Sequence, residues 1–169
     1  MAVYLTTIAS PLGPVRLAAT EKGICALDLP GEEPRWLEGW LDRHFPGEPR
    51  VEAPDHPHLA RAREQLEEYF AGRRQHFDVP LDLRGTPYQL RVWQALLRIP
   101  YGAVTTYGAL ARMAGGSPRS VGGALGANPV AILVPCHRVV AAGGGLGGYS
   151  GGLRIKERLL ALEGIRLPA

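Results

Sequence analysis

Cys136 is the residue of this 169-residue chain whose surroundings best suit covalent chemistry. It lies in the segment 132–140, ILVPCHRVV, directly after Pro135 and before His137 and Arg138. The thiolate is the nucleophilic form of cysteine, and neighbouring positive charge lowers the pKa of the thiol. We therefore expect a reactive thiol of lowered pKa at Cys136, although the apolar residues on both sides also fit an inert, buried cysteine.

His137 is the expected base for this thiol. Adjacent side chains seldom point at each other, so we expect the imidazole to take the proton through a water molecule. An acidic side chain would orient the imidazole, and the second half of the chain offers Asp82, Glu157 and Glu163. Glu163, at the end of the last predicted helix, is the preferred partner. On these residues alone a cysteine–histidine hydrolase also stays open.

The second cysteine, Cys25, needs a separate explanation. It lies far from Cys136 in the sequence, and neither belongs to a C-x-x-C pair, so the spacing predicts no zinc ribbon and no thioredoxin-type site. The chain shows neither an apolar run long enough to span a membrane nor a secretory signal, so we expect a cytoplasmic protein, where structural disulfides are rare. Cys25 is interpreted as a small, buried residue of a strand.

The charge is unevenly distributed along the chain. Residues 1–80 carry 13 acidic and 9 basic side chains, which gives a net charge of −4. Residues 81–169 carry 3 acidic and 10 basic side chains, which gives +7. The second half could therefore face a polyanion such as DNA, or it could be an ordinary solvated surface.

The first 80 residues predict a small α/β domain. Short apolar runs separated by turn residues indicate an antiparallel meander of strands at 3–8, 15–19 and 24–29. Amphipathic spacing predicts two helices, 33–45 with Trp36, Leu37, Trp40 and Leu41 on one stripe, and 58–71 with Leu59, Leu66, Tyr69 and Phe70. The stretch 46–57 is interpreted as a surface loop, and one short strand is expected near 77–81.

Residues 81–169 predict a set of short helices. Thr86, Pro87 and Gln89 form the capping-box signature of a helix that continues to Pro100, with an apolar face of Leu90, Trp93, Leu96 and Leu97. Further helices are expected at 107–113, 118–127 and about 153–162. The pair 107–113 and 118–127, joined by a tight glycine-containing turn, fits a helix-turn-helix, a pattern that many small helical domains also contain.

The second helix of this pair has an unusual composition for a base-reading helix. Readout in the major groove needs Arg, Asn or Gln, but the segment 117–127, SPRSVGGALGA, has Arg119 as its only charged residue. Glycines at 122, 123 and 126 cost about 1 kcal/mol each in a helix relative to alanine. Close approach to the minor groove of DNA would offset this cost, and so would tight packing on a neighbouring helix.

Several motifs keep a common order over residues 85–164. They are GTPYQ (85–89), VW (92–93), IPYG (99–102), TY (106–107), NP (128–129), PCHRV (135–139), GGYSGG (147–152), Lys156 and LLALEG (159–164). Together they resemble the O6-alkylguanine-DNA alkyltransferase family. The first third fits this family more loosely, through SPLG (10–13) and the strand that ends at Leu29.

The resemblance implies a role for the residues that match its motifs. Cys136 would accept the alkyl group, His137 would take the thiol proton through a water, and Glu163 would orient the imidazole. Tyr107 would donate a proton or hydrogen bond to N3 of the guanine. Arg119 would enter the base stack where the damaged nucleotide has been flipped out.

The resemblance also implies which residues surround the damaged base and the DNA. The base would lie among Asn128, Val139, Tyr149, Ser150 and Lys156, and Asn128 would also brace the turn around the site. Apart from Arg119, the DNA would be contacted by Thr106, Ser117, Gly122 and Ala124. The segment between Tyr107 and Arg119 is shorter than in many relatives, while the distance of 17 residues from Arg119 to Cys136 is kept.

The implied architecture is α+β, with a ribonuclease H-like α/β domain over 1–80 and a helical domain of winged-helix or helix-turn-helix type over 81–169. The implied function is single-turnover repair of O6-alkylguanine, with O4-methylthymine as a second candidate substrate. The partner would be double-stranded DNA, bound through its minor groove by a monomer, with no cofactor, structural zinc or membrane involved. A DNA-binding regulator, or a relative that binds lesions without repairing them, is the alternative.

Overall fold

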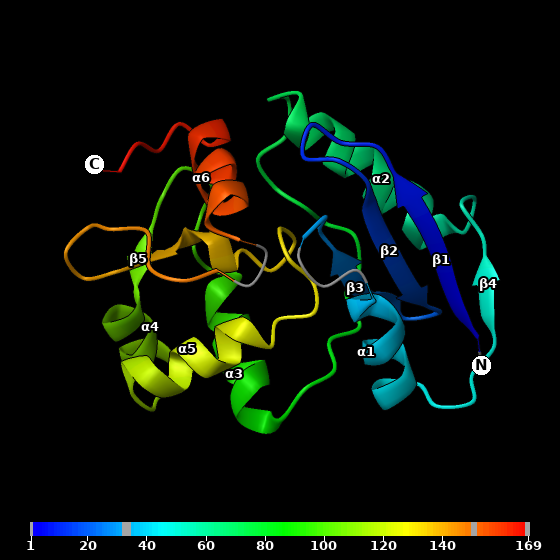
Figure 1. Ribbon diagram of the computed structural model, residues 1–169, viewed down its shortest axis with the longest axis horizontal. Coiled ribbons are helices and arrows are strands. Elements are labelled where there is room, and N and C mark those ends of the chain that lie inside the picture. The colour runs from blue at the N-terminus through cyan, green and yellow to red at the C-terminus, as the bar shows by residue number, and fades with distance from the viewer. Residues whose placement is uncertain (1, 32–34, 150–151, 168–169) are drawn as a thin grey trace. The chain divides into compact units, whose positions relative to one another are not determined.

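The computed structural model describes residues 2–31, 35–149 and 152–167 of the chain. The chain divides into two compact units, Met1–Arg84 and Gly85–Ala169, whose elements are labelled in Figure 1. Within the described residues, every helix is too short or too polar to cross a bilayer.

A four-stranded sheet forms the centre of the described part of the first unit. Its strands are β1 (Val3–Ile8), β2 (Val15–Thr20), β3 (Gly23–Asp28) and β4 (Arg50–Glu52), in the order β3-β2-β1-β4. β1, β2 and β3 are antiparallel neighbours, as the alternation of apolar runs and turns predicts, with Leu5 opposite Ala18 and Leu17 opposite Leu27. β4 pairs in parallel with β1, so the interpretation of 46–57 as a loop throughout is wrong. All three residues of β4 are exposed, and such a strand carries no apolar alternation.

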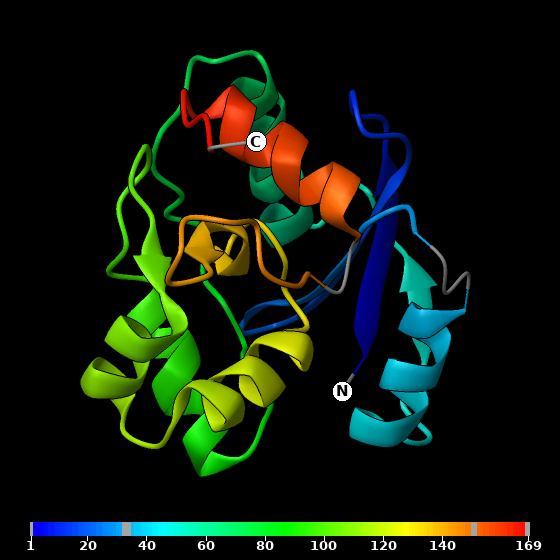
Figure 2. The ribbon, with the colours of Figure 1, turned by 60° about the vertical axis from the view of Figure 1, so that its left-hand side comes forward.

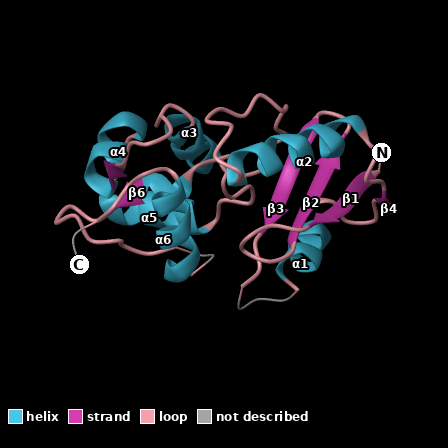
Figure 3. Cartoon of the chain, turned by 90° about the horizontal axis from the view of Figure 1, so that it is seen from above, coloured by secondary structure: helices cyan, strands magenta, loops and turns pink. Residues whose placement is uncertain are grey.

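Two helices cover opposite faces of this sheet, as Figure 3 shows. They are α1 (Trp36–His44) and α2 (Pro57–Phe70). The buried residues of α1 are Leu37, Trp40 and Leu41, and those of α2 include Leu59, Leu66 and Tyr69. The two predicted stripes are therefore the packed faces of the helices, with Trp36 and Phe70 at their half-buried margins. The expected strand near 77–81 is reduced to a single parallel bridge between Leu81 and Ile24.

The second unit is mainly helical. Its helices are α3 (Pro87–Leu96), α4 (Tyr107–Ala114), α5 (Pro118–Gly126) and α6 (Leu153–Leu162), with a 3-10 turn, η1, at Cys136–Arg138. α3 begins with the predicted capping box, in which Thr86 and Gln89 each satisfy the other's backbone amide. It ends earlier than Pro100, so Leu97 falls outside the helix and is 42% exposed instead of lying on the apolar face. α3, α4 and α5 pack on one another, with α4 and α5 as the two helices of a helix-turn-helix.

A parallel ribbon of two short strands joins distant parts of the second unit. β5 (Thr105–Thr106) directly precedes α4, and β6 (Val139–Val140) directly follows η1. The ribbon lies between α6 and the group of α3, α4 and α5 (Figures 1 and 2). Strands of two residues have no detectable period, so the sequence does not predict them. The ribbon holds the start of α4 in register with the segment that follows Cys136.

Candidate functional site

Asn128 braces the segment that leads to Cys136. Its Nδ2 donates to the carbonyl oxygen of Val134 at 2.9 Å, and its Oδ1 accepts from the amide of Val130 at 3.0 Å. Between these contacts Ile132 has a φ of 70°, a conformation that a β-branched residue seldom adopts and that marks a sharp turn. The segment before the cysteine is thus fixed by a buried side chain rather than by a regular element.

Cys136 lies at the wall of a cavity of about 260 Å³ within the second unit. The side chain is nearly covered, since the residue is only 5% exposed. The described residues that line the cavity are Tyr107, Gly122, Leu125, Gly126, Cys136, Gly148 and Tyr149. Three of these residues come from α5 and two from the segment before α6. The sulfur is therefore shielded from bulk solvent but faces a space that a small molecule could enter.

His137, Arg138 and Glu163 form a buried network of ionisable side chains. His137 Nε2 lies 2.6 Å from Glu163 Oε2. Arg138 donates to both carboxylate oxygens, from Nε at 2.8 Å and from Nη2 at 3.0 Å, and its Nη1 donates to the carbonyl oxygen of Ile99 at 2.7 Å. The structure thus brings together His137 and the acidic residue that the sequence favours, whereas Glu157 is exposed.

The environment of His137 keeps its imidazole neutral at pH 7. Burial lowers the pKa of His137 below its ordinary value of 6.5, against the opposing pull of the Glu163 carboxylate. A carboxylate accepts the Nε2 proton, so the lone pair lies on Nδ1. Nδ1 is buried and has no hydrogen-bond partner among the described residues. His137 is therefore arranged to accept a proton at Nδ1.

The expectation of a lowered pKa at Cys136 is wrong. Burial raises the pKa of this thiol above its ordinary value of 9.0 and outweighs the opposing effects of Asn128, of the Lys156 charge and of Tyr149. Arg138, expected to stabilise the thiolate, is instead engaged by Glu163. Because Cys136 is held as a thiol, its reactivity depends on a base that removes the proton as reaction begins.

Lys156 fastens the loop on one side of the cavity. Its Nζ donates to the carbonyl oxygens of Val139 at 2.5 Å, Gly148 at 3.0 Å and Leu146. Burial lowers the pKa of Lys156 to about 8, and its positive charge favours the thiolate of Cys136. Lys156 and Val139, both expected to surround the base, are buried and are not among the described residues that line the cavity.

Tyr107 reaches the cavity from the first turn of α4. Its Oη accepts a hydrogen bond from the amide of Gly148 at 3.1 Å, a contact that does not use the phenolic proton. A Cβ on Gly147 would lie 2.7 Å from this oxygen, so the close approach requires glycine. Thr106, expected at the DNA interface, caps α4 through its Oγ1, which accepts from the amide of Ala109 at 3.1 Å.

α5 presents one face to solvent and one to the protein. Ser117 and Arg119 at its start are exposed, and Gly122 contributes to the cavity wall. Ala124, expected to contact DNA, is 3% exposed, and its carbonyl oxygen accepts a hydrogen bond from Trp93 Nε1 at 2.9 Å. Ala124 therefore belongs to the packing between α3 and α5 instead of the outer face. Ser150, expected beside the base, lies outside the described residues.

Sequence reasoning missed several residues that support this site. Leu125, Gly126 and Gly148 line the cavity, and the unusual glycines of 117–127 were the signal for part of that wall. The IPYG motif supports Glu163, because the amide of Gly102 donates to Glu163 Oε1 at 3.3 Å. The motif is part of the family resemblance, but nothing in its spacing indicates that it meets the end of the last helix.

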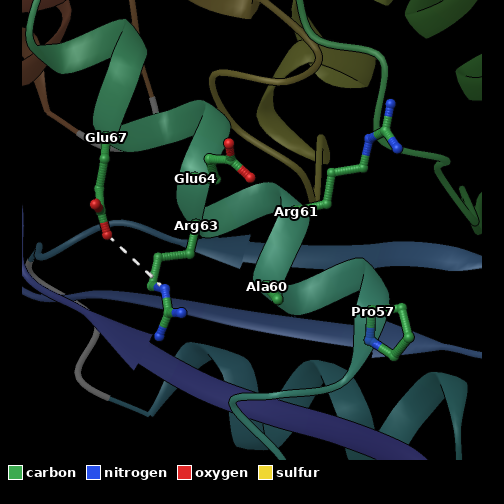
Figure 4. A pocket seen from close by; sticks show the side chains of 6 residues that line it. All are labelled: Pro57, Ala60, Arg61, Arg63, Glu64 and Glu67. Carbon is green, nitrogen blue, oxygen red and sulfur yellow. Dashed lines mark ion pairs between the residues drawn. The ribbon is translucent and has the colours of Figure 1, made fainter.

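A second hollow and the second cysteine carry no such chemistry. A hollow of about 590 Å³ lies along α2 and is lined by Pro57, Ala60, Arg61, Arg63, Glu64 and Glu67 (Figure 4). All six residues belong to one helix, and the ion pair drawn there, Arg63 with Glu67, is 3.8 Å long. Cys25 is buried in β3, where burial raises its pKa to about 12 and keeps it an unreactive thiol.

Fold and site together define a protein that joins a sheet-based α/β unit to a helix-turn-helix unit with a cysteine facing a cavity. Residues 3–83 match the ribonuclease-like domain of the family described as 6-O-methylguanine DNA methyltransferase, and residues 87–165 match its DNA-binding domain. The chain therefore belongs to the 6-O-methylguanine DNA methyltransferase family.

Named relatives and solved structures agree with this assignment over nearly the whole chain. A methylated-DNA–protein-cysteine methyltransferase of Mycobacterium bovis is 44% identical and covers 99% of this chain and 96% of its own length. The constitutive enzyme of that name from Bacillus subtilis is 43% identical, with 96% of each chain covered. The structure of Mycobacterium tuberculosis OGT in complex with DNA has a TM-score of 0.81 at 43% identity, and covers 95% of this chain and 92% of its own.

Proposed function

We propose that this protein repairs O6-alkylguanine in double-stranded DNA by moving the alkyl group irreversibly to Sγ of Cys136, once per molecule. The observation that carries the proposal is the position of Cys136 at the wall of a cavity in the unit that matches the DNA-binding domain. The O6 substituent lies at the major-groove edge of a stacked, paired base, and the sulfur is nearly buried, so the damaged nucleotide must turn out of the base stack to reach the sulfur. Such eversion costs roughly a few kcal/mol.

The helix that carries Arg119 also forms part of the cavity wall, which supports entry of the nucleotide along α5. Arg119 is exposed on the first turn of α5, and Gly122 and Gly126 line the cavity further along the same helix. A small-residue helix face allows close approach to the minor groove, and a long cation at its start suits insertion into the gap in the stack. We assign this wedge function to Arg119.

The transfer is a displacement at the alkyl carbon. His137 Nδ1 takes the thiol proton through a water, and the resulting thiolate forms the S–C bond while the C–O6 bond breaks. The Glu163 carboxylate, 2.6 Å from Nε2, stabilises the imidazolium that this produces. In balance, the alkyl group moves from oxygen to sulfur and a proton moves from the thiol to the purine.

Tyr107 is the proposed proton donor to the leaving base. Tyr107 lines the cavity, and its Oη uses a lone pair, not its proton, in the bond from the Gly148 amide. Donation to N3 of the purine lets the guanine leave as a neutral molecule, and a positioned acid of this kind contributes about 10²–10⁴-fold to a rate. The phenol then recovers a proton from the imidazolium through solvent.

The product explains why each molecule acts once. A thioether at Cys136 is not hydrolysed by any group of this site, so the acceptor is used up. All the proposed groups come from one unit of one chain, so a monomer suffices, and the transfer needs neither metal nor organic cofactor. O4-methylthymine presents the same O-alkyl chemistry and is the second substrate to test.

The deciding experiment uses duplex DNA that contains O6-[methyl-³H]methylguanine. We expect label to move to the protein to one equivalent and stay there. Cys136→Ala should bind the duplex without taking label, whereas the matched variant Cys25→Ala should take label like the unchanged protein. A parallel duplex with labelled O4-methylthymine measures the second substrate.

The alternatives predict different outcomes in the same assay. Binding without transfer by the unchanged protein would indicate a lesion-binding or regulatory protein. Release of label beyond one equivalent would indicate a turnover enzyme such as a cysteine–histidine hydrolase. Transfer of label to Cys25→Ala but not to Cys136→Ala distinguishes the proposed acceptor from the second thiol.

A further inference from the structure

Tyr88, on α3, fastens the turn of the helix-turn-helix. Its Oη donates to the carbonyl oxygen of Gly115 at 2.9 Å and lies 2.9 Å from Ser120 Oγ. Gly115 ends α4, and Ser120 belongs to the first turn of α5. One phenolic oxygen therefore connects the end of the first helix of the motif to the start of the second.

Arg91 adds a second attachment one turn further along α3. Its guanidinium carbon lies 5.2 Å from the centroid of the Tyr88 ring, and its Nε donates to the carbonyl oxygen of Ala114 at 3.3 Å. A cation over an aromatic face is attracted to the ring and restricts its motion. The carbonyl groups of Ala114 and Gly115 are thus both held by side chains of α3.

Gly116 shows how closely Tyr88 approaches the turn. A Cβ at this position would lie 2.4 Å from Tyr88 Oη and 2.5 Å from Ser120 Oγ, and the φ of Gly116 is 86°. Both the close approach and the left-handed backbone require glycine. The turn between α4 and α5 therefore runs in direct contact with the hydroxyl group of Tyr88.

Ser120 also stabilises the start of α5. The amide of Ser117 donates to Ser120 Oγ at 2.9 Å, and the amide of Ser120 donates to Ser117 Oγ at 3.2 Å, which completes a capping box. Arg119 lies between these two residues. The position of its backbone is therefore set by a network whose outer attachment is the hydroxyl of Tyr88.

We propose that the Tyr88 hydroxyl is a positioning group that sets the first turn of α5 so that Arg119 enters the duplex in the right place. This inference rests on the wedge function proposed for Arg119. Tyr88 is not among the described residues that line the cavity, so its effect is confined to steps that involve duplex DNA. Reaction with a free base, which needs no eversion, does not use it.

Tyr88→Phe tests the inference because it removes one oxygen and keeps the ring under Arg91. We expect single-turnover transfer from duplex O6-methylguanine to slow about three- to tenfold, the effect of losing one typical hydrogen bond. The rate with free O6-benzylguanine should stay within about a factor of two of the unchanged protein. The midpoint of thermal unfolding should fall by no more than about 6 °C, the effect of losing one hydrogen bond. Tyr4→Phe, which also loses a hydroxyl but in the first unit, should match the unchanged protein in every measurement.

A double-mutant cycle identifies the residue through which Tyr88 acts. In an Arg119→Ala background, Tyr88→Phe should cause no further loss on duplex DNA, because the group it positions is gone. Equal losses in both backgrounds, equal losses on duplex and free base, or no loss at all would each overturn the inference. If the unchanged protein transfers no label, the proposed function of the site is wrong. If Arg119→Ala repairs duplex DNA at full rate, the wedge function proposed for Arg119 is wrong. Either result would also overturn the inference about Tyr88.

Discussion

Replacing Glu163 by glutamine should damage both the stability of the second unit and its chemistry. The carboxylate receives hydrogen bonds from His137 at 2.6 Å, from Arg138 at 2.8 and 3.0 Å, and from the amide of Gly102 at 3.3 Å. Glutamine has nearly the same shape but no charge, and one of its two terminal atoms donates instead of accepting. Arg138 would then be buried beside a neutral group.

The size of the effect follows from these contacts. Removing one partner of a buried ion pair costs about 3–5 kcal/mol of folding stability. Because glutamine retains part of the hydrogen bonding, we expect the free energy of unfolding to fall by about 3 kcal/mol. For a chain of this length 1 kcal/mol corresponds to roughly 2–4 °C, so the unfolding midpoint should fall by about 6–12 °C. The amide NH₂ also donates to Nε2 and turns Nδ1 into a donor, so the imidazole no longer accepts the thiol proton, and transfer should slow at least about 100-fold.

Calorimetry at pH 7 and single-turnover transfer from a labelled O6-methylguanine duplex measure the two effects. Glu157→Gln is the matched control, because Glu157 is exposed on α6 and its replacement should change stability by less than about 0.5 kcal/mol. A midpoint within 2 °C of the unchanged protein would refute the energetic reasoning. A transfer rate within about threefold of the unchanged protein would refute the relay from Cys136 through His137.

Three further outcomes are expected. The pKa of His137 is lowered from its ordinary value of 6.5, so as the pH falls the unfolded chain binds this proton before the folded chain does. The free energy of unfolding should therefore fall as the pH drops below 6.5. Denaturant titrations at pH 7 and pH 5 measure this fall, and His137→Gln should reduce it. Tyr107→Phe should slow transfer about 100-fold with little change in the unfolding midpoint, and a rate equal to that of the unchanged protein would exclude a proton donor. Lys156→Met removes the donor that joins the carbonyl of Val139 in β6 to the loop carbonyls of Leu146 and Gly148. Limited proteolysis should therefore cut residues 141–148 faster, and equal cutting rates would contradict the fastening role of Lys156.

Elements with strong local signals agree with the sequence predictions. α3 begins at Pro87 because Thr86 and Gln89 satisfy its free amides, a preference that local sequence alone encodes. α6 spans the predicted residues, and β1, β2 and β3 follow their apolar runs. β4, β5 and β6 are too short for a period to develop, and their pairing depends on residues far away in the chain.

The site shows the same division between local and distant causes. The pairing of His137 with Glu163 was expected because acidic residues are scarce in the second half of the chain. The raised pKa of Cys136 is not predicted, because the neighbours in sequence, His137 and Arg138, suggest positive charge beside the sulfur. Arg138 points to Glu163 and the sulfur is buried, so desolvation decides the outcome. Which way a side chain points depends on tertiary packing, and sequence spacing does not report it.

The parallel pairing of Thr106 with Val140 brings two segments that are far apart in the sequence to a fixed separation. Tyr107 follows one strand of this ribbon and Cys136 lies just before the other. The same pair of two-residue strands therefore positions both the phenol and the sulfur. Lengthening or shortening the loop at 114–117 would change how far Arg119 reaches without changing the separation of the two reacting side chains. Because α5 also lines the cavity, the position of Arg119 and the shape of the cavity would change together, while the ribbon keeps Tyr107 and Cys136 in register.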